Sequence, residues 1–245
     1  MEGADAGSHL LDRLGQSVAA QAVPAGPWLV TALAAAAVIV AVPPLWRVLR
    51  PLVTVVHELG HAVVGLLCGR RFTGFAVSPD MSGHTVTAGR PRGAGLVLTT
   101  LAGYPMPALV GAAMIAAAMA GRADPVLLAA LVLLLTALAR SRSLFTVAVL
   151  AAGLVGVGAL WWTGDVAATS TVVAGAGMVL LVGAWRQFGA VVAGGGRADD
   201  PAALARITRA PAWAWKLLMA VLIAAPTGWA VRALLPVVAL ALASP

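Results

Sequence analysis

The chain has 245 residues, of which 61% are hydrophobic and only 10% are charged, and its mean hydropathy is +0.95. This balance excludes an ordinary soluble globular domain and predicts an integral membrane protein. The net charge of +7 comes from basic residues scattered between apolar runs. That distribution predicts membrane topology and contact with the lipid bilayer, and no nucleic-acid partner.

The first 26 residues are predicted to form a polar N-terminal tail, because Glu2, Asp5 and Asp12 come before any apolar run. The tail lacks the basic segment that opens a cleavable signal peptide. We therefore expect the first apolar span to stay in the mature protein. Residues 27–245 are expected to form one integral membrane domain.

Continuous apolar runs of roughly 20 residues predict helices that cross a bilayer. Strands of a membrane barrel would alternate between apolar and polar residues, and these runs do not. The expected fold class is therefore an all-α polytopic, multi-pass protein of the cell membrane, with six or seven transmembrane helices. The predicted spans lie near residues 27–46, 51–68, 94–120, 124–139, 143–162, 168–187 and 211–232.

Two polar stretches interrupt the apolar pattern. Residues 69–93 are rich in Gly, Thr and Ser and contain short alternating pieces at 72–77 and 84–88, which predict a small β-hairpin after the second span. Residues 188–210 form a polar connector, where an aspartate before Pro201 is typical of a helix N-cap followed by proline at the first helical position.

Basic residues gather in three of the predicted connections, at 69–93, 140–142 and 186–209. With the spans above, these three regions lie on one face of the membrane, which the positive-inside rule makes cytoplasmic. Arg47 and Arg50 do not follow this rule, because the same topology places them on the outer side of the membrane.

The second predicted span carries ionisable residues that a lipid-facing helix does not need. His57 and His61 are four residues apart, so both imidazoles project from one face of a helix and can share one zinc ion. Glu58 follows the first histidine, where it can reach a water molecule activated by the metal. This H-E-x-x-H spacing is typical of zinc-dependent peptide hydrolysis, with the glutamate as general base.

The same spacing can occur without catalysis. Short H-E-x-x-H matches arise by chance in soluble helices, and histidine pairs also serve proton relays. A carboxylate within a membrane helix costs roughly 2.5 to 3.5 kcal/mol on translocon scales, which favours a functional role. A catalytic zinc also needs a third protein ligand, and a lone cysteine, Cys68, excludes a cysteine-built site. The candidates are Asp80, His84, Asp124, Asp165, Asp199 and Asp200.

The stretch HELGHAVVGLLCGRRFTGFAVSP resembles the site-2 proteases, which are intramembrane zinc metallopeptidases. In that family the H-E-x-x-H helix is followed by a glycine, a short strand and an F-x-x-G-F-like segment, here Gly69, Phe72, Gly74 and Phe75. The predicted hairpin then corresponds to the family's membrane-associated β element. Because the chain has no insert the size of a PDZ domain, it is most similar to the compact branch of the family. LAGYPMPALVGA is also similar to a family helix start.

The resemblance implies a third zinc ligand far downstream, commonly an aspartate within an Asp-Gly pair, which this chain lacks. The compact branch carries a segment like S-D-A-x-x-L-A-x-x-T followed by proline and tryptophan. Alignment on Leu204, Thr208 and Trp213 places the ligand at Asp200. Asp199 is then assigned to the helix cap, and His84, on the same predicted face, is the reserve ligand.

The predicted function is an intramembrane zinc metalloprotease that cleaves a peptide bond in or near a transmembrane segment of a membrane protein or peptide substrate, as in regulated intramembrane proteolysis. His57, His61 and Asp200 would bind Zn²⁺, and Glu58 would be the general base. The substrate is expected to lie in extended form against the hairpin. The alternative is a non-catalytic membrane zinc-binding, transport or scaffold protein. A transporter would need ionisable residues along a path across the bilayer, and the other long spans have none.

Overall fold

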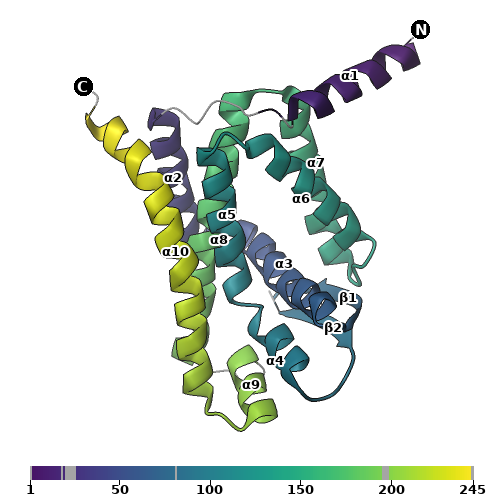
Figure 1. Ribbon diagram of the computed structural model, residues 1–245, viewed down its shortest axis with the longest axis vertical. Helices are drawn as coiled ribbons and strands as arrows, with labels where there is room; N and C mark the ends of the chain where they lie inside the picture. Colours follow the sequence, from purple (N-terminus) through teal and green to yellow (C-terminus); the bar gives the residue numbers. More distant parts are fainter. Residues whose placement is uncertain (1, 18, 20–25, 81, 195–198, 244–245) are drawn as a thin grey trace.

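The computed structural model describes residues 2–17, 19, 26–80, 82–194 and 199–243. Helices dominate this part of the chain, with one two-stranded antiparallel sheet beside them (Figure 1). In chain order the elements are α1 (Glu2–Ser17), α2 (Gly26–Ala41), α3 (Pro43–Leu67), β1 (Arg71–Val77), β2 (Gly83–Ala88), α4 (Ala94–Leu101), α5 (Pro105–Met119), α6 (Ala123–Leu138), α7 (Leu144–Thr163), α8 (Val166–Gly194), α9 (Asp200–Thr208) and α10 (Ala212–Ala243).

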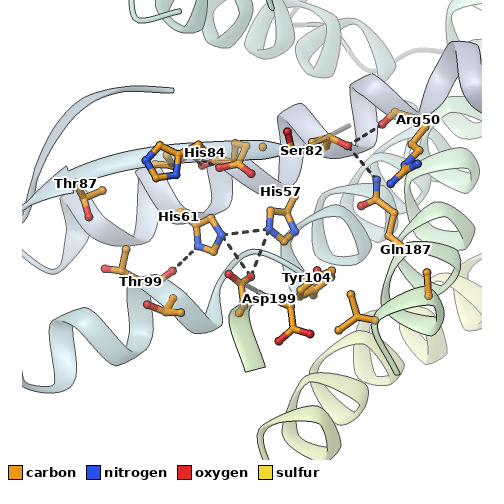
Figure 2. Close-up of a pocket in the computed structure, with 18 of the residues that line it drawn as sticks. Arg50, His57, His61, Ser82, His84, Thr87, Thr99, Tyr104, Gln187 and Asp199 are labelled. Carbon is orange, nitrogen blue, oxygen red and sulfur yellow. Dashed lines mark hydrogen bonds and ion pairs between the residues drawn. The ribbon is translucent and has the colours of Figure 1, made fainter. Parts of the chain in front are cut away.

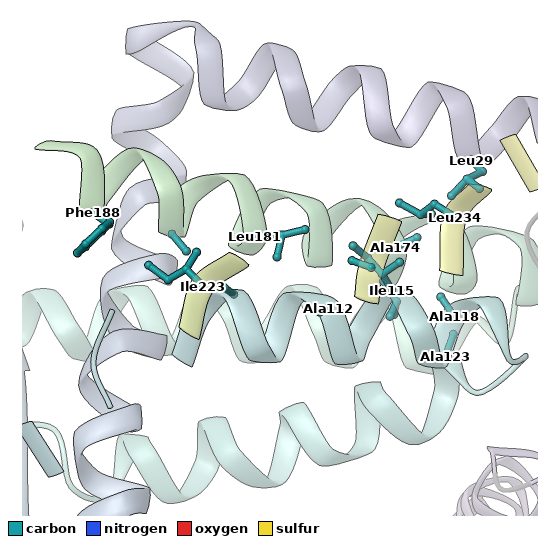
Figure 3. Close-up of a cluster of buried hydrophobic side chains, with 14 of the residues drawn as sticks. Leu29, Ala112, Ile115, Ala118, Ala123, Ala174, Leu181, Phe188, Ile223 and Leu234 are labelled. Carbon is teal, nitrogen blue, oxygen red and sulfur yellow. The ribbon is translucent and has the colours of Figure 1, made fainter. Parts of the chain in front are cut away.

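Four helices, α2, α5, α8 and α10, form the apolar bundle on which the rest of the molecule is built. Small residues bring α5 and α8 into backbone contact: a Cβ atom added at Gly111 would collide with the Gly177 carbonyl oxygen. Apolar side chains fill the bundle (Figure 3), and those that are almost fully buried include Leu29, Ala112, Ile115, Ala174, Leu181 and Ile223.

The apolar helices make this chain a membrane protein. Among the described residues, α7, α8 and α10 are long and apolar enough to cross a bilayer, and the number rises to five if each of two bent helix pairs is one span. The apolar helix α6 is shorter, with 16 residues. The all-helical fold with a small hairpin is thus confirmed, whereas the count of six or seven spans stays a prediction.

The first bent pair corrects the predicted boundary between the first two spans. The break falls at Val42, not at 47–50, and α3 runs without interruption through Pro51. Pro43 and Pro44 supply no backbone N–H and push the residue before them out of the helical region, so Val42 is extended, with φ −83° and ψ 114°. As a result α3 turns by 99° from α2 and crosses the molecule (Figure 1).

The second bent pair replaces the single span predicted at 94–120. Helix α4 ends at Leu101 and α5 begins at Pro105, with an angle of 62° between them. Proline is well placed at a helix start because its missing N–H has no partner there. The bend brings the segment between these helices and the start of α5 against α3: a Cβ atom at Gly60 would lie 3.0 Å from the Ala102 carbonyl oxygen and 2.7 Å from Met106 Cβ.

The hairpin predicted within residues 69–93 is present as β1 and β2, joined in antiparallel register from Arg71 opposite Ala88 to Val77 opposite Gly83. An irregularity at Gly74, with φ +145°, bends β1. The turn between α6 and α7 supports its outer edge, where the Phe75 amide donates to the Arg140 carbonyl oxygen at 3.2 Å and the Arg142 amide donates to the Phe75 carbonyl oxygen at 2.9 Å. Only β2 keeps an edge unpaired within the described strands.

The basic regions at 69–93, 140–142 and α9 lie toward the end of the molecule away from α1, and Figure 1 shows the hairpin, the α6–α7 turn and α9 in its lower half. The connector predicted at 188–210 is shorter than expected, since α8 continues to Gly194. Residues 195–198 lie outside the described part, and α9 follows directly after them. The membrane face on which this end lies stays a prediction.

Helix α1 occupies most of the stretch predicted as a polar tail, and it docks at the opposite end of the molecule. The Arg13 guanidinium donates to Asp124 Oδ2 at 3.3 Å and to the Trp161 carbonyl oxygen at 2.6 Å. The Trp161 indole donates to Ser17 Oγ at 2.8 Å. The Asp124 side chain is only 2% exposed, and the Arg13 cation helps to offset the cost of burying it.

Replacing Arg13 by glutamine is expected to release α1 from the α6–α7 end, because the change leaves Asp124 with less compensation. Breaking a buried ion pair costs roughly 3 to 5 kcal/mol. Because Arg13 is partly exposed, we expect the cost of breaking this pair to lie at or below the lower limit of that range. Hydrogen exchange of α1 in detergent should therefore accelerate. Arg122→Gln, an exposed arginine near the same end, is the control, and equal exchange in both variants would contradict this account.

Candidate metal centre

Helix α3 presents the two histidines of the motif on one face, as the spacing predicted. The Nε2 atoms of His57 and His61 are 3.2 Å apart, and their rings meet edge to face with centroids 4.8 Å apart (Figure 2). His61 Nδ1 donates to the Thr99 carbonyl oxygen of α4 at 2.7 Å. A proton on Nδ1 leaves Nε2 as a free electron-pair donor, so α4 fixes the tautomer that a metal ligand needs.

Asp200 completes the cluster from the far end of the sequence. Its Oδ2 lies 3.4 Å from Nε2 of both His57 and His61. This oxygen is buried and makes no hydrogen bond within the described residues. Burial works against ionisation, yet the pKa of Asp200 is lowered because His61 and His57 face its carboxylate. The structure thus holds a charged acceptor where a cation would satisfy it.

The short helix α9 delivers Asp200 in a fixed orientation. Asp199 is its N-cap and accepts the Ala202 amide at 2.8 Å, and proline follows at position 201. The C-terminal end of α9 is bonded to α10, because Thr208 Oγ1 accepts a hydrogen bond from the Trp215 indole N–H at 3.1 Å. The neighbouring aspartates therefore divide the two tasks, since one caps the helix while the other faces the histidines.

The bend between α4 and α5 places the backbone of Gly103 in close contact with the cluster. A Cβ atom added at Gly103 would lie 2.6 Å from Asp200 Oδ2 and from His57 Nε2, so no other residue fits there without displacing a ligand atom. The Tyr104 ring packs edge to face on His57, with centroids 4.6 Å apart (Figure 2). The sequence pattern did not identify Thr99, Gly103 and Tyr104 as site residues, although LAGYP had marked a helix start.

Strand β2 holds Glu58 beside the cluster. The carboxylate is buried, with the residue 4% exposed, and Oε2 accepts the Thr85 hydroxyl at 2.6 Å. Gly83 leaves the room that the other carboxylate oxygen fills, since any Cβ atom there would collide with Oε1. Thr85 and Gly83 are thus positioning residues for Glu58, and no sequence motif had marked them.

The three side chains of the cluster and Glu58 line one cavity of about 970 Å³ (Figure 2). His84 lines the cavity, but among the described residues the group that could hold a metal is His57, His61 and Asp200, whose ligand atoms lie within 4.8 Å of one another. The remaining candidates have separate roles: Asp80 accepts from Ser82, Asp124 pairs with Arg13, and Asp165 caps α8.

The cluster fits a zinc ion by its chemistry. Two imidazole nitrogens and one carboxylate oxygen are the set of three protein ligands typical of a catalytic zinc, which keeps a further position open. The buried, unsatisfied Asp200 oxygen and the close approach of Gly103 both agree with an ion held between the three side chains. Glu58 stands apart from this set, as a proton acceptor should.

Fold and site together are those of a membrane protein with a group of side chains that could hold a metal ion. A family model, described as Peptidase M50B-like, matches residues 30–230, and the chain belongs to this family. The resemblance to site-2 proteases is thereby confirmed. No curated protein and no solved structure matches the chain.

Replacing Asp200 by alanine is expected to lower the zinc content of the detergent-purified protein from about one ion per chain to near zero, because a ligand charge is lost. Asp199→Asn is the matched control: it removes the neighbouring negative charge but keeps a good N-cap for α9, and so leaves the cluster in place. Metal analysis by mass spectrometry gives the comparison. Equal loss in both variants, or loss in His84→Ala with retention in Asp200→Ala, would show that the third ligand is not Asp200.

Proposed function

We propose that the protein is a zinc metalloendopeptidase that cleaves a peptide bond in or near a transmembrane segment of a membrane protein substrate. The observation that carries the proposal is the convergence of α3 and α9, which sets His57, His61 and Asp200 around one point with Glu58 beside it. Membership of the Peptidase M50B-like family supports the reaction class.

His57, His61 and Asp200 would hold the zinc ion, which when bound would polarise the peptide carbonyl and lower the pKa of a water molecule. Glu58 would accept the proton of the attacking water and then pass it to the leaving amine. Thr85 supports this role, because its hydroxyl holds one carboxylate oxygen at 2.6 Å while the backbone at Gly83 confines the other. The carboxylate is thereby fixed in place before the substrate arrives.

Strand β2 would bind the substrate in extended form. Its partner β1 is bonded on both sides, to β2 and to the α6–α7 turn, so the available strand edge is that of β2. Residues 83–87 of β2 also line the cavity that contains the metal cluster. A peptide added to this edge would have its backbone paired next to Glu58, which suits cleavage of an unwound segment.

Glu58→Gln should abolish cleavage while leaving about one zinc per chain, because the amide keeps the shape of the side chain but cannot accept the proton. The assay is a pooled library of single-span membrane peptides reconstituted with the protein in liposomes, with cleavage sites read by mass spectrometry. Asp165→Asn, the same chemical change at the start of α8, is the control and should retain activity. A Glu58→Gln protein that cleaves at the wild-type rate would favour the non-catalytic scaffold.

A further inference from the structure

The cavity that holds the metal cluster continues along α3 away from it. Trp46, Arg50, Thr54 and Glu58 follow one another at four-residue steps and all line this cavity. Four-residue steps keep side chains on one side of a helix, and the rise of 1.5 Å per residue makes this row about 18 Å long. The cavity is thus a groove with Trp46 at one end and Glu58 further along it, beside the metal cluster.

Helix α8 forms the facing wall at the Trp46 end. The Arg186 guanidinium lies over the Trp46 ring, 5.0 Å from its centroid, and the Gln187 amide donates to Thr54 Oγ1 at 3.1 Å (Figure 2). The two helices approach closely here, because a Cβ atom at Gly183 would lie 3.0 Å from both Trp46 and Val53 side chains. Arg50, one turn beyond Trp46, therefore shares this end of the groove with Arg186.

These two arginines have no carboxylate partner within 4.0 Å among the described residues. The carboxylates that line the groove are otherwise engaged: Glu58 with Thr85, Asp199 as a cap and Asp200 at the histidines. Asp80, on the turn of the hairpin, accepts the Ser82 hydroxyl and amide. The pKa of Asp80 is lowered first by these Ser82 hydrogen bonds and to a lesser extent by Arg50, which is not in contact with it. Arg50 and Arg186, both half-buried, thus have no carboxylate of the described chain in direct contact, which is the partner that guanidinium groups bind best.

We propose that Arg50 and Arg186 form a subsite for an acidic side chain of the substrate. The inference rests on the proposed protease function and adds a substrate preference to it. The eight residues from Arg50 to Glu58 span about 12 Å of helix. An extended chain covers this distance in three or four residues, so the acidic residue lies about three to five residues from the scissile bond.

A peptide fits this groove better than a lipid headgroup does. Thr54 and Gln187 line the path between the arginines and the metal cluster. The part of the Gln187 amide that is not bonded to Thr54 can pair with the backbone of a peptide, whereas acyl chains offer no partner for it. The path also reaches the cluster and β2 without leaving the cavity. The same peptide can therefore place its acidic side chain at the arginines and its scissile bond beside Glu58.

The test compares matched peptides from the liposome library that differ only by Glu or Gln at positions three to five from the cleavage site. Wild type should cleave the acidic peptides with kcat/KM roughly 10-fold higher, mostly through KM, since one charge-assisted contact is worth about that factor. In the double variant Arg50→Gln, Arg186→Gln, the ratio of kcat/KM between the Glu and Gln peptides should be about one. The Arg50→Glu variant should cleave a peptide with Lys at these positions faster than the peptide with Glu. Arg47→Gln, an exposed arginine of α3 outside the cavity, should keep the wild-type ratio.

Binding separates failure of the subsite from failure of the protease proposal. The Glu58→Gln protein in liposomes of neutral lipid should bind the acidic peptide roughly 10-fold more tightly than its Gln counterpart, and the double arginine variant should lose this difference. Equal binding of both peptides overturns the subsite even if cleavage occurs. If the arginine variants instead lose only the retention of anionic lipid, the groove end belongs to a lipid phosphate and the peptide proposal is wrong.

Discussion

The structure depends on the meeting of one carboxylate with two imidazoles inside a largely apolar protein. Asp200 Oδ2 stands 3.4 Å from both histidine Nε2 atoms and has no other hydrogen-bond partner among the described residues. An isolated buried carboxylate is costly, and a cation shared between the three groups would offset that cost. The two breaks at Val42 and Gly103 and the short helix α9 all serve to bring these side chains together.

The bends explain how helices built for a membrane can carry a cluster of ionisable residues. Because α3 turns by 99° from α2, its histidines and Glu58 face a cavity with polar walls. The same turn resolves the anomaly of Arg50, which a simple span order put on the face opposite Arg186. The structure places both arginines in one cavity, so their positions no longer conflict. A span broken in this way is acceptable where the irregular backbone lies against protein or a water-filled space.

Local chemistry made much of the fold and site predictable from the sequence. Apolar runs marked the helices, the alternation at 72–77 and 84–88 marked the hairpin, and the i to i+4 spacing placed His57 and His61 together. The assignment of Asp200 as a ligand came from a family resemblance, because no local rule distinguishes it from Asp199, and it stays a prediction that the geometry of the cluster supports. Thr85, Gly83 and the Thr99 carbonyl could not be predicted, since their importance arises only when β2 and α4 pack on α3. Similarly, the polar composition of residues 1–26 did not predict helix α1. This helix docks through Asp124 and Trp161, which come from distant helices.

The central claim is that zinc is held by two histidines and one aspartate, and X-ray absorption at the zinc edge of the purified protein tests it most directly. The account predicts a first shell of nitrogen and oxygen at about 2.0 to 2.2 Å, with the outer-shell scattering of two imidazoles and no sulfur. Scattering from three imidazoles would bring His84 into the site in place of Asp200. A sulfur neighbour at about 2.3 Å, or a shell without imidazole, would contradict the account.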